Sequence, residues 1–347
     1  MTLLRMPKLS VGAAVGLVVS LSAVDVFAQD ASEFFNGRQI RMIVGSDAGG
    51  GYDTYGRFVA RHLGNHLPGK TATFVVQNIA GAGSIIAMNY LYNVAPKDGS
   101  ALGAVNPGSI AEPLFSPDKA KYDPRSFAWV GSVMRDTEVI LAWHEAPIKK
   151  FDDLFATEML SGSTGGSSAA STLPRLINGL LGTHLKLIEG YKGANDIVLA
   201  MERGEVQGYG SASWSGIRNS QQRLLTDKKL VVVAQYGLVP HPDLTDIPIV
   251  MNYAKTDEQR AVLRLMLTRQ EIGRPFLLPP GTPAPIVTTY RKGFDEMIKD
   301  QAFVDELKGR NLDLAPATGD ETATMVDGIF SVSDEIVQKV KTLLSSK

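Results

Sequence analysis

The chain has 347 residues, of which 44% are hydrophobic and 20% are charged, and its formal net charge is -1. This length favours two domains over one, and the composition is typical of a globular protein with a substantial core. The near-neutral charge lacks the excess of basic residues that nucleic-acid binding requires, and the absence of cysteine excludes disulfide bonds.

The first 28 residues have the features of a cleaved signal peptide. Arg5 and Lys8 supply positive charge before an apolar segment, residues 9–24, that is rich in small residues. Val26 and Ala28 stand at the two positions that a signal peptidase reads, so we expect cleavage after Ala28. A membrane anchor is the alternative, but the segment falls short of the ~20 strongly apolar residues of a span. We therefore predict a protein exported to the periplasm.

Residues 41–66 combine a strand, a glycine loop and a helix. Residues 40–44 form a short apolar run with β-branched members, which predicts a buried strand. Three glycines follow at 49–51, and we expect Asp53 to cap the next helix. Such a loop presents free backbone N–H groups and the positive end of a helix dipole to an anion. A plain strand-to-helix turn without a ligand is the alternative.

The same arrangement recurs twice. A strand expected at 73–77 leads to a loop with Gly81 and Gly83, and a helix follows at about 85–94 with Ser84 as its cap. Residues 160–170 form a third loop of serine, threonine and glycine before a helix expected at about 172–181. A flexible linker is the alternative for this loop. Its place between an apolar and an amphipathic segment favours another turn that faces an anion.

Strands and helices alternate along most of the chain, which indicates mostly parallel sheets covered by helices. Further strands are expected at 101–105, 186–189, 206–209, 230–235 and 274–278, with an irregular segment at 106–123. Apolar runs at 127–134 and 138–143 are expected to carry the chain into a second domain. Further helices are expected at 194–203, 257–268, 284–299, 301–310 and 320–344. We predict an α/β fold of two lobes with a cleft between them. The first lobe would comprise 29–130 and a return segment, 273–347, and the second would comprise 131–272.

Catalytic and metal-binding motifs are incomplete in this sequence. Gly81-x-Gly83 lacks the third glycine of a dinucleotide fingerprint, because Ile86 stands there, and no Gly-x-Ser-x-Gly nucleophile elbow occurs. His62 and His66 lie four residues apart without the rest of a zinc motif, so solvated or packed histidines are the simpler interpretation. We therefore expect a binding protein without cofactor or metal rather than an enzyme.

The ordered set of motifs resembles the solute receptors of tripartite tricarboxylate transporters, the Bug or TctC type. The first-lobe motifs are Gly49-Gly50-Gly51-Tyr52-Asp53, Asn78-x-x-Gly81-Ala82-Gly83 and Ala95-Pro96-Lys97-Asp98-Gly99. The later motifs are 162–168, Gly190-Tyr191-Lys192-Gly193, 200–206 and Pro279-Pro280-Gly281-Thr282-Pro283. Each motif is loose alone, but the ordered set is specific and covers nearly all of the chain after the expected signal peptide.

The resemblance implies a two-lobed periplasmic receptor, a Venus flytrap, that closes on a small organic carboxylate. The ligand would be a di- or tricarboxylate or an aromatic carboxylate, and a monomeric receptor would deliver it to a two-component membrane permease. In this family, backbone amides and waters in two first-lobe loops largely hold the carboxylate. The residues that the resemblance implies in the first lobe are Ser46, Gly49, Gly50, Gly51, Tyr52, Asp53, Gly81, Ala82, Gly83, Ser84 and Asn106. Those in the second lobe are Thr164, Gly165, Ser167, Ser168, Tyr191, Ser211 and Trp214.

Two departures from the family pattern leave the identity of the ligand open. Ala48 and Tyr52 stand where a proline and a threonine commonly flank the glycines. The second loop reads Ile-Ala-Gly-Ala-Gly-Ser at 79–84, where the family commonly has Arg-Pro-Gly-Ala-Gly-Gly. A ligand sensor for a membrane signalling partner would need the same lobes, so it stays an alternative. A periplasmic hydrolase is a weaker alternative, because no triad or metal cluster is evident.

Overall fold

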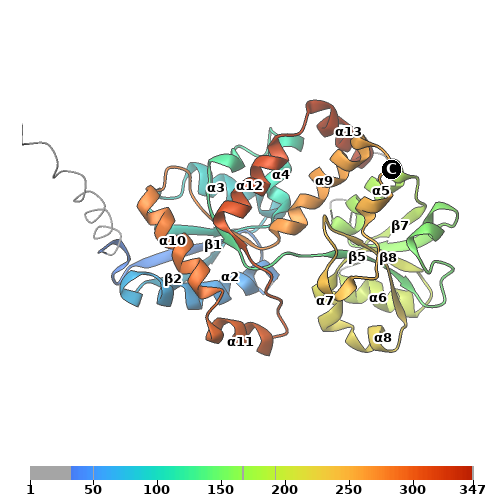
Figure 1. The fold of residues 1–347 in the computed structure, drawn as a ribbon, viewed down its shortest axis with the longest axis horizontal. Helices are drawn as coiled ribbons and strands as arrows, with labels where there is room; N and C mark the ends of the chain where they lie inside the picture. The colour runs from blue at the N-terminus through green and yellow to red at the C-terminus, as the bar shows by residue number, and fades with distance from the viewer. Residues whose placement is uncertain (1–32, 50, 166–167, 192, 346–347) are drawn as a thin grey trace, which may run out of the picture.

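The computed structural model describes residues 33–49, 51–165, 168–191 and 193–345. Two separate sheets flanked by helices organise this part of the chain into two lobes (Figure 1), which confirms the expected α/β fold. The expected signal peptide at 1–28, as well as Gly50 and Ser167, lies outside the described residues. Among the helices that are described, none has the length and apolar character needed to cross a bilayer.

The first lobe is built on a six-stranded mixed sheet in the order β11-β4-β10-β3-β1-β2. Its strands are β1 (Gln39–Val44), β2 (Thr73–Asn78), β3 (Ala101–Ala104), β4 (Ala128–Ser132), β10 (Pro275–Leu278) and β11 (Ala317–Thr318). Its helices are α2 (Gly51–His62), α3 (Ile85–Asn93), α4 (Gly108–Phe115), α10 (Ala284–Met297), α11 (Gln301–Gly309) and α12 (Gly319–Phe330). β1 pairs in parallel with both β2 and β3, and Ile40, Met42 and Ile43 are fully buried. Such a central parallel strand is apolar on both faces, because helices cover the sheet on each side.

The second lobe is built on a five-stranded mixed sheet in the order β7-β6-β8-β5-β9. Its strands are β5 (Glu138–Trp143), β6 (Met159–Ser163), β7 (Leu185–Glu189), β8 (Gly208–Ser213) and β9 (Leu230–Tyr236). Its helices are α5 (Ala169–Leu181), α6 (Ala194–Glu202), α7 (Trp214–Ser220) and α8 (Gln222–Thr226). Short 3-10 helices complete both lobes at Leu63–His66, Pro68–Lys70, Ala82–Ser84, Pro124–Ser126, Phe151–Phe155, Pro242–Leu244 and Val250–Tyr253.

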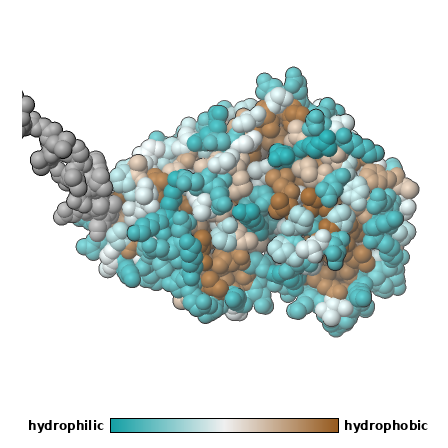
Figure 2. Space-filling view, viewed as in Figure 1, coloured by the Kyte–Doolittle hydropathy of each residue, from teal (hydrophilic) through white to brown (hydrophobic). Residues whose placement is uncertain are grey.

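Two helices pack across the junction of the lobes. α9 (Asp257–Ile272) contacts α12 of the first lobe, and α13 (Asp334–Ser345) contacts both α9 and α5 of the second lobe. One hydrophobic cluster contains Met88 of the first lobe, Leu263 of α9 and Leu173 of the second lobe. Figure 2 shows hydrophobic side chains at the surface around α9, within a face that is otherwise mostly hydrophilic. The lobes therefore share apolar packing on this side of the molecule.

The chain crosses between the lobes in two adjacent segments, 133–137 and 273–274, which we call the crossing segments. The backbone N–H of Arg274 donates to the carbonyl of Met134 at 3.0 Å. The backbone N–H of Asp136 donates to the carbonyl of Gln270 at 2.9 Å. Gly273 has a φ of +52°, and a Cβ there would collide with the Met134 carbonyl, so only glycine permits this approach. The domain boundary expected between residues 130 and 131 falls inside β4, and we place the first crossing after Ser132.

The prediction of an irregular segment at 106–123 was wrong, because residues 108–115 form α4. Pro113 lies inside this helix and cannot donate to the carbonyl of Ser109, four residues before it. The hydroxyl of Tyr122 donates to that carbonyl at 2.7 Å instead. A side chain from outside the helix thus satisfies the acceptor that the proline leaves free, which local sequence cannot reveal.

Other boundaries also differ from the prediction, and α7 and α8 were not predicted. The start of the expected third loop, 160–163, belongs to β6, where Gly162 permits close packing of Ile197 against the sheet. The strand expected at 206–209 is β8 at 208–213. The helix expected at 320–344 is two helices, α12 and α13, interrupted at 331–333. Ser333 and Asp334 lie at the start of α13, and serine and aspartate favour helix N-termini over helix interiors.

Candidate functional site

A cavity of about 520 Å³ lies between the lobes. The first lobe contributes α2, the loop before α3, and the start of α4, while the second lobe contributes the start of α5 and of β5. The crossing segments and the C-terminal end of α9 form the remaining wall. Its lining includes Tyr52, Ala82, Gly83, Asn106, Ser109, Glu112, Lys119, Asp136, Glu138, Ser168, Arg269, Gln270 and Arg274. A ligand in this cavity would contact both lobes at once.

Asp53 stabilises the loop that joins β1 to α2, which we call the opening loop. It is not the N-cap that we expected, because α2 begins at Gly51 and places Asp53 in the first helical turn. Its buried carboxylate accepts hydrogen bonds from the Gly49 N–H, from Arg57 and from Asn78, each at 2.8 Å. Burial would raise the pKa of Asp53, but these hydrogen bonds outweigh burial and lower it. The carboxylate therefore fixes the loop and is not part of the cavity lining.

Ser84 joins the second loop to the ends of two strands. It does not cap α3, because its side chain makes no bond to the helix and its φ is +78°. Its buried hydroxyl donates to the Gly45 carbonyl at 2.7 Å and accepts from the Asn106 N–H at 3.0 Å. Gly45 follows β1 and Asn106 lies two residues after β3. One hydroxyl thus holds together the three loops that form the first-lobe wall of the cavity.

Replacing Ser84 with alanine is expected to lower the free energy of unfolding by about 2–3 kcal/mol. The variant leaves the partly buried N–H of Asn106 and the buried carbonyl of Gly45 without this partner, and the cost of unsatisfied buried groups exceeds the value of an ordinary hydrogen bond. Urea denaturation of the purified chain measures the change. Ser46→Ala, which removes an exposed hydroxyl in the opening loop, should change stability by less than about 0.5 kcal/mol. Equal values for the two variants would contradict the role of Ser84.

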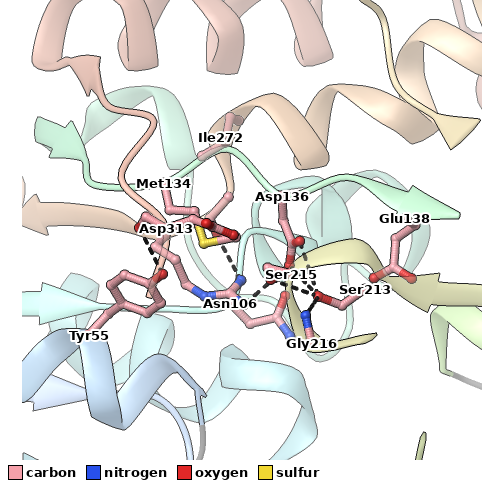
Figure 3. A network of polar contacts seen from close by, with 12 residues as sticks. Tyr55, Asn106, Met134, Asp136, Glu138, Ser213, Ser215, Gly216, Ile272 and Asp313 are labelled. Atoms are coloured by element: carbon pink, nitrogen blue, oxygen red, sulfur yellow. Dashed lines mark hydrogen bonds and ion pairs between the residues drawn. The ribbon is translucent and has the colours of Figure 1, made fainter. Parts of the chain in front are cut away.

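An ion pair between Asp136 and Arg274 joins the crossing segments at the cavity. The carboxylate and guanidinium groups are 3.2 Å apart, and only 9% and 14% of the two side chains is exposed. Ser213, at the end of β8, donates to the same carboxylate at 3.2 Å (Figure 3). The guanidinium lies 4.3 Å from the centre of the Tyr52 ring, a cation–π contact with the first lobe. Residues from α2, β8 and both crossing segments therefore meet at this wall.

Arg269 and Glu138 provide the other charged groups at this wall. Arg269, one turn before the end of α9, is half-buried, and within the described chain no carboxylate lies within 4 Å of it. Burial lowers the pKa of Arg269, while Glu138 opposes that effect. Burial, followed by the negative charge of Asp136, raises the pKa of Glu138 to about 7. The cavity thus contains a cation without a close counterion beside a carboxyl group that is only partly ionised near neutral pH.

The structure brings five of the predicted ligand-binding residues into the cavity lining: Tyr52, Ala82, Gly83, Asn106 and Ser168. Ser211 reaches the cavity indirectly, because its hydroxyl donates to Glu138 at 2.7 Å. Gly51 begins α2, and a Cβ there would lie 3.7 Å from the Arg274 guanidinium. Burial raises the pKa of Tyr52, which keeps its hydroxyl protonated.

The other described residues of that prediction lie outside the lining. Ser46, Gly49, Gly81, Thr164 and Gly165 lie in the same loops without lining the cavity. Tyr191 and Trp214 pack in the hydrophobic cluster of the second lobe, and the buried indole N–H of Trp214 has no partner in the part of the chain that the structure describes. The resemblance implied a ligand contact for Trp214, and in the structure its ring is buried in this cluster.

Sequence reasoning missed the charged residues that line the cavity, among them the four at the wall formed by the crossing segments, α9 and β5: Asp136, Glu138, Arg269 and Arg274. Two weak signals were available. Glu138 is the first residue of an apolar strand, and Asp136 lies two residues before it. Because side chains two residues apart in an extended segment point to the same face, both carboxyl groups lie on one face (Figure 3). The two arginines lie on either side of the end of a helix whose last two turns are mostly buried. Neither signal shows that the two acidic residues lie beside the two arginines. Their proximity arises because the two crossing segments, which are distant in the sequence, run antiparallel to each other.

Residues 64–71 have the Gly-x-x-x-x-Gly-Lys-Thr spacing of a phosphate-binding loop, a match that sequence reasoning also missed. That motif works between a strand and the helix that follows it. Here the segment lies after α2 and before β2, so Lys70 and Thr71 lead into a strand. The spacing therefore occurs without the helix N-terminus that would bind a phosphate.

A second set of contacts joins the lobes at α7. Arg218 of α7 contacts the carboxylates of Asp243, in its own lobe, and of Asp313, in the first lobe. Asn219 donates to the carbonyl of Asn311 beside it. These polar contacts, together with the apolar packing around α9, hold the lobes in the arrangement that encloses the cavity.

Comparison with solved structures gives matches along most of the chain. A TctC solute-binding protein from Polaromonas matches with a TM-score of 0.68 and 19% identity, over 88% of this chain and 97% of that one. The periplasmic binding protein BugD matches with a TM-score of 0.58 and 21% identity, over 88% and 96%. MatC from Rhodopseudomonas palustris, solved with bound malate, matches with a TM-score of 0.59 and 18% identity, over 89% and 99%.

No family model and no curated protein matches the chain. At these identities the likeness is one of fold. This chain therefore has the two-lobed fold of the TctC and Bug-type periplasmic solute-binding proteins.

Proposed function

We propose that the chain is a periplasmic receptor that binds a small organic carboxylate in the cavity between its lobes. The observation that carries this proposal is Arg269, a cation in a cavity lined by both lobes, without a carboxylate within 4 Å among the described residues. A guanidinium in that position favours a planar anion such as a carboxylate. Malate in MatC is a ligand of this class bound by a neighbour of the same fold.

Backbone groups of the first lobe support the same interpretation. Gly83 and Asn106 line the cavity from the ends of two loops, and α4 begins at Gly108 in the same wall. A helix N-terminus contributes partial positive charge to an anion beside it. A cavity of about 520 Å³ can enclose an organic acid of a few carbon atoms together with water.

The destination of the ligand is the second part of the proposal. The matched proteins are solute-binding proteins rather than enzymes, and one of them is named as a periplasmic transporter. We infer that this chain, exported and cleaved after Ala28, acts as a monomer and presents its ligand to a two-component membrane permease. Co-purification of the tagged receptor with a permease, and its loss when the ligand is removed, would test this partner.

Calorimetric titration of a panel of organic acids tests the binding function. The panel includes succinate, malate, citrate and benzoate, and the methyl esters of the same acids serve as uncharged controls. A ligand that binds only the folded state should also raise the melting temperature in proportion to the logarithm of its concentration. We expect at least one acid to bind while its ester does not. Equal binding of acid and ester, or no binding by any acid, would contradict the proposal.

A further inference from the structure

Glu138 is a carboxyl group in the cavity wall without a close cation. It is the first residue of β5, and its side chain accepts a hydrogen bond from Ser211 at 2.7 Å. Within the described residues, no lysine, arginine or histidine nitrogen lies within 4 Å of it. Its neighbour Asp136, by contrast, forms an ion pair with Arg274. The two carboxyl groups of this wall therefore have different environments.

Charged and titratable groups from several elements around the cavity wall interact electrostatically with Glu138. They are Asp136 and Arg274 from the crossing segments, Arg269 from α9, Tyr52 from α2, Tyr209 from β8 and Tyr236 from β9. Burial raises the pKa of all three tyrosines, so they are neutral near pH 7. Because Asp136 already compensates Arg274, Arg269 is the cation whose charge most directly favours an ionised Glu138.

We propose that Glu138 takes up a proton when a carboxylate binds at Arg269, and that it thereby selects acids without a positive charge at its end of the cavity. The inference rests on the proposed function, since it needs a carboxylate in this cavity. The ligand's negative charge cancels the field of Arg269 and adds a second negative neighbour to Asp136. The step is a simple protonation in which a solvent proton forms an O–H bond on the Glu138 carboxylate. The neutral group then has a hydrogen-bond donor for an oxygen of the ligand.

The position of Glu138 makes this exchange accessible near neutral pH. Burial and Asp136 already raise the pKa of Glu138 to about 7 in the free protein, and a bound anion raises it further. Below the free value, Glu138 is protonated with or without ligand and takes up no proton. At a pH between the pKa of Glu138 in the free protein and its pKa in the complex, binding takes up one proton. The affinity should therefore fall by up to about tenfold for each unit by which the pH rises. Above the bound value the dependence ends.

The two halves of the proposal predict opposite behaviour for two related ligands. Malate and aspartate differ in one substituent, a hydroxyl in the first and an ammonium group in the second. An ammonium group beside Glu138 stabilises the ionised carboxylate and releases a proton, whereas malate requires the protonated form. We therefore expect malate to bind at least about tenfold more tightly than aspartate at about pH 6, where Glu138 is mostly protonated.

Calorimetry in two buffers with different ionisation enthalpies measures the proton uptake directly. With the highest-affinity acid of the panel, fully ionised at about pH 7.5, we expect uptake of about half a proton per ligand. Glu138→Gln should bind the acid with no uptake and with an affinity that no longer changes with pH. Glu145→Gln, an exposed carboxylate just beyond the other end of β5, is the matched control and should keep the wild-type uptake.

Each result supports or contradicts a specific part of the account. An acid that binds without proton uptake, or with the same uptake in Glu138→Gln, would overturn this inference and leave the proposed function intact. Tighter binding of aspartate than of malate would overturn the selectivity. Failure of every acid to bind the wild-type protein would instead contradict the proposed function, and with it this inference.

Discussion

Replacing Arg269 with glutamine is expected to weaken binding of the highest-affinity carboxylate by about 10- to 150-fold. A hydrogen bond between a charged group and its partner contributes about 1.5–3 kcal/mol, which corresponds to that loss of affinity. Glutamine keeps part of the length of arginine and its ability to donate, but it lacks the positive charge. The half-buried guanidinium has no carboxylate partner within 4 Å in the described chain, so its removal breaks no ion pair. Calorimetric titration gives the affinity, and urea denaturation gives the stability.

Arg264→Gln is the matched control for this variant. Arg264 lies on the same helix, α9, and its side chain is exposed. The two substitutions remove the same charge from the same element, so they share any general effect on helix stability and net charge. We expect Arg264→Gln to bind as the wild type does. Equal affinities for both variants would show that the ligand does not contact the wall formed by α9.

Replacing Asp136 with alanine is expected to lower the free energy of unfolding by about 3–5 kcal/mol. The loss leaves the Arg274 guanidinium buried without its counterion, and breaking a buried pair costs far more than such a pair contributes net. The buried Arg274 Nε has no hydrogen-bond partner among the described residues, so the side chain has little alternative hydrogen bonding. Urea denaturation measures the change, provided that both lobes unfold in one transition.

Two further variants separate the ion pair from other effects at Asp136. Asp136→Ala combined with Arg274→Met should recover most of the lost stability, because an apolar pair avoids the buried charge. Glu158→Ala removes an exposed carboxylate 3.8 Å from Lys186 and should cost less than about 0.5 kcal/mol. If Asp136→Ala alone lowers the free energy of unfolding no more than Glu158→Ala does, the ion pair between Asp136 and Arg274 does not stabilise the crossing segments.

Local patterns were enough to predict the two-lobed α/β fold but not all of its elements. The strand at 39–44 and the helix after the glycine loop follow directly from apolar runs and helical spacing. α4 was missed because its proline normally excludes a helix interior, and only the distant hydroxyl of Tyr122 satisfies the freed carbonyl. The division of the last helix was missed because hydrophobic spacing continues through the interruption at 331–333.

The candidate site was predictable where backbone loops form it and unpredictable where the two crossings meet. Gly83 was expected because a strand, a glycine turn and a helix recur in order, and Asn106 was expected through the resemblance. Arg269 and Asp136 are more than 130 positions apart in the chain and come together only through the return of the chain beside its first crossing. Asp53 was assigned to the helix cap because aspartate favours that position, whereas its carboxylate joins the loop at Gly49 to Arg57 of α2 and Asn78 of β2.

The most direct test of the account is a crystal structure of the chain with the highest-affinity acid of the panel. The account predicts a carboxylate within about 3.2 Å of the Arg269 guanidinium, a hydrogen-bonding distance. The same ligand should contact the first-lobe wall near Gly83 and Asn106 and the second-lobe wall near Ser168. An acid found elsewhere, for example beside Lys70 and Lys292 on the first lobe, with the cavity between the lobes holding only water, would contradict it.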